Sequence, residues 1–351
     1  MRGIAAIAAA LAVLAACGLG GGSSGGSAAS SWVDQPVSFP ASGMTVYGTY
    51  RHPTGKMAAI PAALIIAGSG PTDRNGNSPA IGGQVGTLEA LAGWLSAASV
   101  ASLRYDKLGT GQTGLGPYAS DPNSIGIGVF EQEAAAALGF LARQPGVDRA
   151  RLSVYGHSEG ALYALLLATG AAGQAPPVHA LGLLEPLGVR YLDLLSHQID
   201  ARLATQQRAG QLTAAQVAQV QATLSDAIKT LRTAGTVPAG LPDGLSTVLS
   251  PATARYLAEA DRYDPANLAA RLPQGMPVLV SCSDADIQVS CADVDHLAVG
   301  LARAAADTDL VRLTGVDHVL KEDSSATAAY YGRPLPFSSQ LEGAVLDFAR
   351  R

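Results

Sequence analysis

The residues with the clearest chemical potential run from Gly156 to Gly160 and read Gly-His-Ser-Glu-Gly. A short strand is expected before them over 151–155, and a helix over 159–168. A strand that turns at once into a helix strains the residue at the turn, and only small residues two positions to either side avoid a clash. The pattern therefore predicts that Ser158 is a nucleophile above the sheet edge, with a helix N-terminus favouring negative charge beside it.

Three further segments resemble α/β-hydrolases of the esterase and lipase type, and the likeness covers about Val37 to Arg351. Residues 65–77 resemble the strand-to-loop segment of a bacterial esterase subgroup with a Gly-Ser-Gly-Pro-x-Asp-Arg signature. Residues 104–111 are similar to the Arg-Tyr-Asp-Lys-Arg-Gly-x-Gly turn of the same proteins, with Leu108 replacing the usual second Arg. Residues 284–289 resemble their acid loop. The resemblance implies the α/β-hydrolase fold and cleavage of carboxylic esters.

A nucleophilic serine needs a base to accept its proton and a carboxylate to orient that base. In this fold the chain order is serine, acid, histidine. Among six histidines, His318 is the expected base because it follows the last expected strand, Leu310–Leu313. His296 falls in an expected helix and is given a structural role. His157 lies inside the turn and is expected to point away from the serine hydroxyl.

The acid is expected just after the strand that ends near Ser281, where both Asp284 and Asp286 qualify. The family pattern resembles Gly-Thr-x-Asp-x-Gln-Val, and its Asp falls on Asp286, with Ser283 where Gly is usual. Asp286 is therefore favoured, and Asp284 is expected to cap a turn. Asp317, beside the histidine, is a weaker rival and is expected to be an exposed loop charge.

The negative oxygen formed during acyl transfer needs two backbone N–H donors. One is expected from Glu159, the residue after the nucleophile, and the other from Ser69 or Gly70 in the loop after the 62–67 strand. In that loop, Asp73 and Arg74 are expected to form a charged brace. Asp106 is a proposed partner of that brace, with a structural role.

Strands and helices alternate along the chain, which predicts a mostly parallel central sheet flanked by helices. The exception is about 188–263, where Ala, Gln and Leu recur at helical spacing without a convincing strand. This stretch is interpreted as a helical cap insertion over the C-terminal edge of the sheet, where open α/β sheets bind ligands. The expected strands and helices are a hairpin over 37–39 and 44–51, strands at 62–67, 100–105, 151–155, 178–184, 277–281 and 310–313, and helices at 86–98, 130–143, 159–168, 294–305 and 340–350.

The N-terminus has the features of an export signal. Residues 4–16 are wholly apolar, too short to span a bilayer but long enough for a signal-peptide core. They end in Leu-Ala-Ala-Cys, which resembles a bacterial lipobox with Cys17 as the lipidated residue. The prediction is a signal over 1–16, a lipidated Gly/Ser tether over 17–35 and a hydrolase domain over 36–351. An ordinary secretory signal with a chance cysteine is the alternative.

Export opens an oxidising compartment in which Cys282 and Cys291 could form a disulfide. Such a bridge would bracket the acid loop and hold Asp286 in place, whereas two free buried thiols are the alternative. The predicted signal and lipidated Cys17 together place the protein in the cell envelope, where we expect the chain to be anchored to the membrane outside the cytoplasm.

Composition restricts the function classes. With 48% hydrophobic residues among 351, the chain can bury a large core, and a net charge of −5 provides no footprint for nucleic acid. No metal-ligand or phosphate-loop motif is present in the sequence, so neither a metal nor a cofactor is expected. The expected partner is a small ester substrate. A peptidase, amidase or thioesterase of the same fold is the enzymatic alternative, and a non-catalytic surface binding lipoprotein is the alternative of another class.

Overall fold

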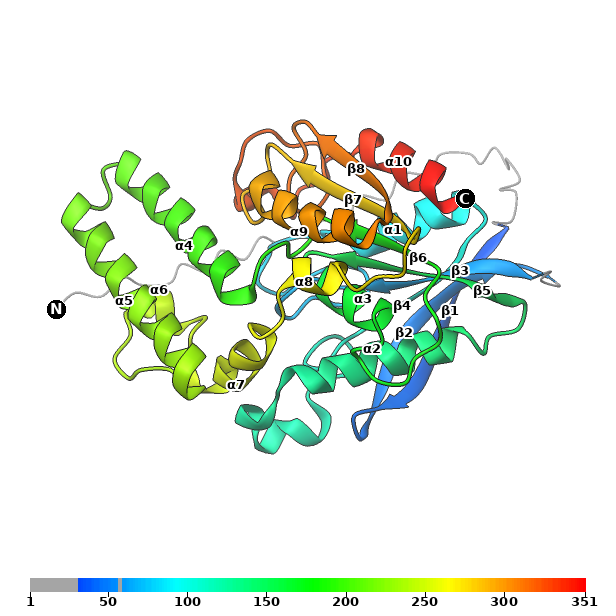
Figure 1. Cartoon of the computed structure of the whole chain (residues 1–351), viewed down its shortest axis with the longest axis horizontal. Helices are drawn as coiled ribbons and strands as arrows, with labels where there is room; N and C mark the ends of the chain where they lie inside the picture. Colours follow the sequence, from blue (N-terminus) through cyan, green and yellow to red (C-terminus); the bar gives the residue numbers. More distant parts are fainter. Residues whose placement is uncertain (1–30, 56–58) are drawn as a thin grey trace, which may run out of the picture. The chain divides into compact units, whose positions relative to one another are not determined.

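The computed structural model describes residues 31–55 and 59–351, and the predicted signal and Cys17 lie outside this part of the chain. Its framework is a sheet of eight strands in the order β1-β2-β4-β3-β5-β6-β7-β8 (Figure 1). The β1–β2 and β2–β4 pairs are antiparallel, and every pair from β4 to β8 is parallel. The strands are β1 Trp32–Ala41, β2 Met44–Pro53, β3 Ile60–Ile66, β4 Ala101–Tyr105, β5 Val147–His157, β6 Ala180–Leu184, β7 Pro277–Ser283 and β8 Asp307–Leu313.

Helices connect the parallel strands, as parallel pairing requires. They are α1 Thr87–Ala97, α2 Ile127–Leu141, α3 Gly160–Ala168, α4 Tyr191–Arg208, α5 Ala214–Ala234, α6 Asp243–Ser246, α7 Pro251–Ala260, α8 Pro265–Ala269, α9 Cys291–Ala304 and α10 Ser339–Ala349. Short 3₁₀ turns occur at Gly116–Ser120, Pro122–Ser124 and Ala328–Tyr330. This alternation confirms the predicted mostly parallel sheet with flanking helices.

Both faces of the sheet are covered, and strand β3 shows how the sequence achieves this. Ala62, Leu64 and Ile66 belong to a cluster with apolar residues of α2, α3 and α9. The alternate residues Ala63 and Ile65 pack on the other face with residues of α1 and α10. Because successive side chains of a strand point to opposite faces, a strand buried on both sides must be apolar throughout.

The first strand corrects one predicted boundary. β1 begins at Trp32, inside the segment 17–35 that the sequence assigns to a tether. Its early residues pair with the end of β2, with Trp32 opposite Pro53, and Asp34 forms an ion pair with Arg51 at 3.0 Å. Alternation in this segment is too weak to mark a strand from sequence, and the partner strand supplies its order.

The stretch between β6 and β7 is helical, and its first four helices build a separate hydrophobic cluster (Figure 1). Two polar contacts attach this cap to the loop after β7 and to helix α9. The Gln198 side chain of α4 donates to the carbonyl of Gln288 at 3.0 Å, and His197 lies 2.8 Å from Asp293 of α9. The cap helices therefore begin beside the carboxyl ends of the parallel strands.

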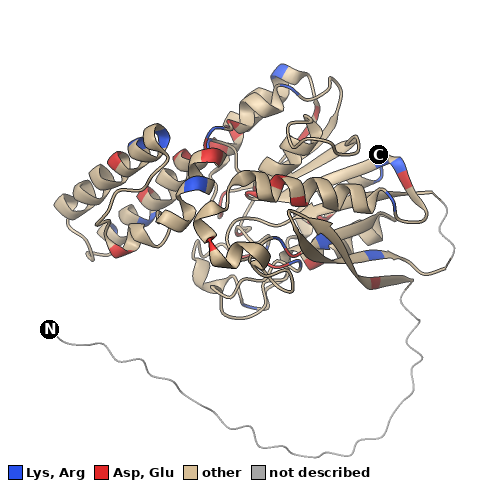
Figure 2. Cartoon of the chain, turned by 90° about the horizontal axis from the view of Figure 1, so that it is seen from below, with Lys and Arg blue, Asp and Glu red and all other residues tan. Residues whose placement is uncertain are grey.

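Charged residues are interspersed over the described chain, and Figure 2 shows the positions of acidic and basic residues scattered along helices and loops. In the segments 31–55 and 59–351, no helix has the length and apolarity needed to cross a membrane.

Candidate active site

The turn that holds Ser158 is the sharpest feature at the C-terminal edge of the sheet. β5 ends at His157 and α3 begins at Gly160, so the serine occupies the connection and takes a left-handed φ of 54°. A Cβ on Gly156 would lie 2.3 Å from Gly160 backbone atoms, and one on Gly160 would lie 2.3 Å from the Ile66 carbonyl oxygen. Both glycines are therefore required by close backbone approach, as the spacing predicts.

The neighbouring strand fixes the backbone of the serine. The Ser158 N–H donates to the carbonyl of Leu184 at 2.9 Å, and its own carbonyl accepts from the N–H of Leu187 at 3.0 Å. The residue is thus held in a conformation that a non-glycine residue rarely adopts, and such strain is concentrated at functional sites. Its side chain lines a cavity of about 290 Å³ together with His318, Ser69 and Gly70.

The structure brings Asp286 and His318 into direct contact. The Nδ1 atom of His318, in the loop after β8, lies 2.7 Å from Oδ2 of Asp286, in the loop after β7. The other carboxylate oxygen accepts the backbone N–H groups of Gln288 at 2.7 Å and Val289 at 3.1 Å. Burial alone would raise the pKa of Asp286, but the charge and hydrogen bond of His318 and these two N–H groups outweigh it and lower that pKa.

The ionised state of Asp286 determines the histidine tautomer. A carboxylate only accepts hydrogen bonds, so Nδ1 of His318 must carry the hydrogen in the bond to Asp286. The neutral ring then presents Nε2 as an acceptor, which is the arrangement that a general base needs. Both members of the expected pair, Ser158 and His318, line the same cavity.

Asp284 and Asp317, the two alternative candidates for the catalytic acid, make other contacts. Asp284 accepts the backbone N–H of Gly315 at 2.8 Å, so it holds the loop that leads to the histidine and does not contact the ring. The expectation of an exposed Asp317 is wrong, because this residue is buried and accepts the N–H of Lys321 at 2.8 Å. Burial raises the pKa of Asp317 to about 6. The tight turn 317–321 encloses it, which the polar local sequence does not reveal.

His157 is a residue of the site to which the sequence pattern assigns no catalytic role. Its Nε2 donates to the backbone carbonyl of His318 at 2.7 Å, and the two rings lie 4.9 Å apart. Burial, followed by the charge of His318, lowers the pKa of His157 to about 3, so the ring stays neutral. It therefore fixes the backbone of the expected base, and its position directly before the serine is the only signal in the sequence.

Arg74 and Asp106 form the expected charged brace of the loop after β3. The two side chains are paired at 2.6 Å, and the N–H of Arg74 donates to the same carboxylate at 2.8 Å. Burial alone would raise the pKa of Asp106, but the Arg74 bonds outweigh it and lower that pKa. Asp73 instead orders its own turn, by accepting the N–H groups of Asn75 at 2.8 Å and Asn77 at 2.9 Å.

A second network, not expected from the sequence, supports the residues assigned to the oxyanion site. The buried ammonium of Lys107 donates to the carbonyl of Gly68 and lies 3.4 Å from Oε1 of Glu159. Tyr191, the first residue of α4, donates to the other oxygen of Glu159 at 2.7 Å and is hydrogen-bonded to the side chain of Ser69. This network joins the expected oxyanion loop, the serine turn and the cap helices.

Comparison with known proteins gives a match at the level of structure only. No family model matches the chain, and no curated protein matches its sequence. The solved α/β hydrolase GrgF from Penicillium sp. sh18 superposes with a TM-score of 0.54 at 16% identity, covering 91% of this chain and 98% of that one. Est1E from Butyrivibrio proteoclasticus gives 0.54 at 16% identity, with 89% and 97% covered. The chain has the α/β-hydrolase fold.

A thermostable esterase from Pseudomonas putida ECU1011 gives a similar result, with a TM-score of 0.53 at 16% identity over 91% of this chain and 82% of the other. In the α/β-hydrolase fold, the nucleophile lies at the turn after a central strand and the acid and base follow later strands. Ser158 after β5, Asp286 after β7 and His318 after β8 occupy such positions in this chain.

The cavity of this α/β-hydrolase fold is small and partly apolar. Val85, Val319 and Tyr331 form a buried cluster with Ile81 on its wall, and polar residues that include Ser158 also line it. Its volume of about 290 Å³ is near the lower end of ligand sites, which span roughly 300–1,000 Å³. A larger hollow of about 950 Å³ beside α2 is lined by none of the three expected catalytic residues. Among residues 31–55 and 59–351, no group of His, Cys, Asp and Glu is placed to hold a metal ion.

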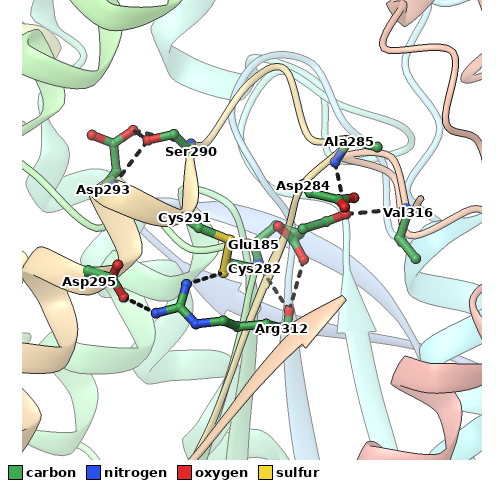
Figure 3. Close-up of a disulfide and its surroundings, with 12 residues drawn as sticks. Glu185, Cys282, Asp284, Ala285, Ser290, Cys291, Asp293, Asp295, Arg312 and Val316 are labelled. Atoms are coloured by element: carbon green, nitrogen blue, oxygen red, sulfur yellow. Dashed lines mark hydrogen bonds and ion pairs between the residues drawn. A yellow bond between two sulfur atoms is a disulfide. The ribbon is translucent and has the colours of Figure 1, made fainter. Parts of the chain in front are cut away.

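The structure contains the disulfide between Cys282 and Cys291, which joins the end of β7 to the start of α9 (Figure 3). The loop between them carries Asp286, and the bridge thus closes the loop at its base. Next to it, Ser283 accepts the N–H groups of Ala285 and Val316, each at 3.2 Å, and so ties this loop to that of His318.

Replacing both bridge residues by alanine, as Cys282→Ala/Cys291→Ala, should lower the free energy of unfolding. The bridge spans a sequence separation of 9, and closing a loop of that length restricts the unfolded chain by about 2–3 kcal/mol. Urea unfolding with and without reductant would measure the loss. The double variant provides the control, because reductant should not affect it. A wild-type unfolding curve that reductant leaves unchanged would contradict the prediction.

Proposed function

We propose that this chain is a serine hydrolase that cleaves carboxylic esters with short or medium acyl groups. The observation that carries the proposal is the meeting of two groups at one cavity. These are a strained Ser158, and a His318 ring bonded at 2.7 Å to the buried carboxylate of Asp286. Nucleophile, base and orienting acid in this relation are the parts that acyl transfer requires.

In the proposed reaction, the Ser158 oxygen attacks the ester carbonyl carbon while Nε2 of His318 takes the hydroxyl proton. Asp286 keeps the ring in the required tautomer and stabilises the imidazolium that forms. The tetrahedral intermediate then collapses, the bond to the alkoxy group breaks, and the departing alcohol takes the proton from His318. Water repeats the sequence on the acyl-enzyme, so that a carboxylic acid leaves and the serine is restored.

The negative carbonyl oxygen of the intermediate is assigned to the backbone N–H groups of Glu159 and of Ser69 or Gly70. Glu159 stands at the N-terminus of α3, where the helix dipole favours negative charge. Its side chain is held by Lys107 and Tyr191, so the backbone beside the serine is constrained from both sides. Such prearranged donors stabilise the charge of the transition state because they need not reorganise during the reaction.

The cavity supports the preference for small acyl groups. A volume of about 290 Å³ with one apolar wall, formed by Val85, Val319 and Tyr331, suits a short chain better than a long lipid. Several structurally similar proteins carry names of esterases, including an acetyl xylan esterase from Paenibacillus sp. R4 with a TM-score of 0.52 at 17% identity. These names support ester hydrolysis as the first activity to measure.

The function is tested by hydrolysis of p-nitrophenyl esters of increasing acyl length, beside aminoacyl p-nitroanilides and acyl thioesters. We expect turnover of acetyl to medium-chain esters that falls for long chains, and labelling by a fluorophosphonate probe, which reacts with activated serines. Faster cleavage of the anilides or thioesters would replace the ester proposal with an amidase or thioesterase. No turnover of any class and no labelling would favour a binding protein.

We also propose that the chain is an exported lipoprotein held at the membrane through Cys17. The apolar stretch 4–16, the Leu-Ala-Ala-Cys sequence and the Gly/Ser-rich segment after it support this proposal. A clickable fatty acid fed to the producing bacterium should label the wild type and not Cys17→Ser. Equal labelling of both proteins would contradict the anchor, and secretion of an unlabelled wild type would indicate an ordinary signal peptide.

A further inference from the structure

Glu185 is a buried acid that the proposed mechanism does not use. It follows β6 directly, has 0% of its surface exposed and takes a left-handed φ of 44°. Its N–H donates to the hydroxyl of Ser281 at 3.1 Å, and the same hydroxyl donates to its Oε1 at 3.2 Å. Figure 3 shows the residue beside Cys282 and the loop of Asp284. A fully buried carboxyl with a strained backbone needs an explanation.

The explanation lies in Asp286, whose carboxyl group is close enough to that of Glu185 for the two to share a hydrogen bond. Oε2 of Glu185 has no hydrogen-bond donor among the described residues. If Glu185 and Asp286 were both ionised, neither could donate to the other, because a carboxylate only accepts hydrogen bonds. Asp286 already accepts from His318, Gln288 and Val289. Two carboxyl groups can share a hydrogen bond only if one of them carries a proton.

That proton belongs to Glu185. Burial, and then the negative charge of Asp286, raises the pKa of Glu185 well above its ordinary value. The pKa of Asp286 is lowered, because His318 and two N–H donors outweigh its burial. The environments of the two neighbouring acids therefore separate their protonation states, which makes one a donor and the other an acceptor.

We propose that Glu185 is a positioning residue of this hydrolase, which stays a neutral carboxylic acid and donates a hydrogen bond to Asp286. The inference rests on the proposed function of Ser158, His318 and Asp286. The bond restrains the Asp286 carboxylate and takes up part of its negative charge. An ionised Glu185 would instead place a second buried charge near His318, and the ring would then hold its proton too strongly to act as a base.

The surrounding charged groups are consistent with a neutral Glu185. His318 and His157 interact electrostatically with each other and with Asp286, and His157 is itself neutral because burial lowers its pKa to about 3. On β8, Arg312 contacts the sulfur of Cys282 at 3.6 Å and is paired with Asp295. This guanidinium is thus engaged by another carboxylate. On the acid loop, Asp284 is bonded to the N–H of Gly315.

The experiment compares Glu185→Gln and Glu185→Met with the wild type. The amide of Gln can donate to Asp286 without a charge, whereas Met has a similar length and no donor. Histidine ¹⁵N NMR follows the protonation of His318 against pH without any turnover, with the signal assigned by its loss in His318→Gln. The acidic limb of the kcat/KM profile provides the parallel kinetic measurement.

We expect Glu185→Gln to leave the midpoint of the His318 titration in place. Glu185→Met should move that midpoint up by about one pH unit, because Asp286 without its donor stabilises the imidazolium more strongly. A downward shift in Glu185→Gln would overturn the proposal, since it would mean that a negative charge had been removed. An unmoved midpoint in a folded Glu185→Met would overturn it as well. If Met prevents folding, the Gln variant alone decides.

Glu133→Gln is the matched control. This second glutamate is also fully buried, burial raises its pKa to about 8, and it accepts the N–H of Leu108. Its replacement should not move the His318 midpoint, whereas a shift as large as that expected for Glu185→Met would mean that changing any buried glutamate has this effect and would overturn the proposal. Fluorophosphonate labelling of the wild type is scored separately, so a failure of the hydrolase function is distinguishable from a failure at Glu185.

Discussion

Replacing Ser158 by alanine should remove both ester hydrolysis and fluorophosphonate labelling. The nucleophile supplies the covalent step, and loss of such a serine in a triad enzyme lowers kcat by about 10⁴–10⁶-fold. The fold should survive, because the backbone bonds of residue 158 to Leu184 and Leu187 do not involve the hydroxyl. Circular dichroism and thermal unfolding would verify that only the chemistry is lost.

Ser153→Ala is the control for this variant. Ser153 lies on the same strand, β5, and pairs with Ala63 and Ala180 away from the turn. We expect hydrolysis and labelling to remain near wild-type levels in this variant. If Ser158→Ala kept measurable labelling at the wild-type rate, another residue would be the nucleophile and the proposed mechanism would be wrong.

The fold was largely predictable because its apolar strands are short, separated by helical patterns and buried on both faces. The run at 62–67 illustrates this, since alternate residues of β3 enter two different clusters. The beginning of β1 was not predictable, because Trp32–Gln35 gain their order from β2 rather than from their own pattern. Local sequence thus identifies elements with strong periodicity, whereas edge strands depend on their partners.

The residues of the candidate site also differ in whether the local sequence predicts them. Ser158 and His318 have local signals, a glycine-flanked turn and a place after the last strand, and the structure brings both to one cavity. Burial has no local signal, which is why Asp317 was expected at the surface. Glu185 and Lys107 come from separate strand ends and act through contacts with residues far along the chain. Such contacts follow from the sheet order, which the motifs alone do not provide.

The second large expected effect is a loss of kcat that distinguishes Asp286 from Asp284, the two acids of the loop after β7. Asp286→Asn should lower kcat by about 10⁴-fold, because an amide can donate to Nδ1 of His318 and hold the ring in the wrong tautomer. The amide also loses the negative charge that stabilises the imidazolium. Kinetics of p-nitrophenyl ester hydrolysis for purified, folded protein would measure the decrease.

Asp284→Asn is the matched comparison, because it changes the same side chain two residues away in the same loop. Its carboxyl accepts the N–H of Gly315 at 2.8 Å, and the amide oxygen of Asn can accept that bond in its place. We therefore expect less than about a tenfold change in kcat, since only the brace of the histidine loop is weakened. A larger loss for Asp284→Asn than for Asp286→Asn would exchange the two roles. Equal, small losses would mean that neither acid orients His318, because an essential carboxylate cannot be neutralised without affecting the base.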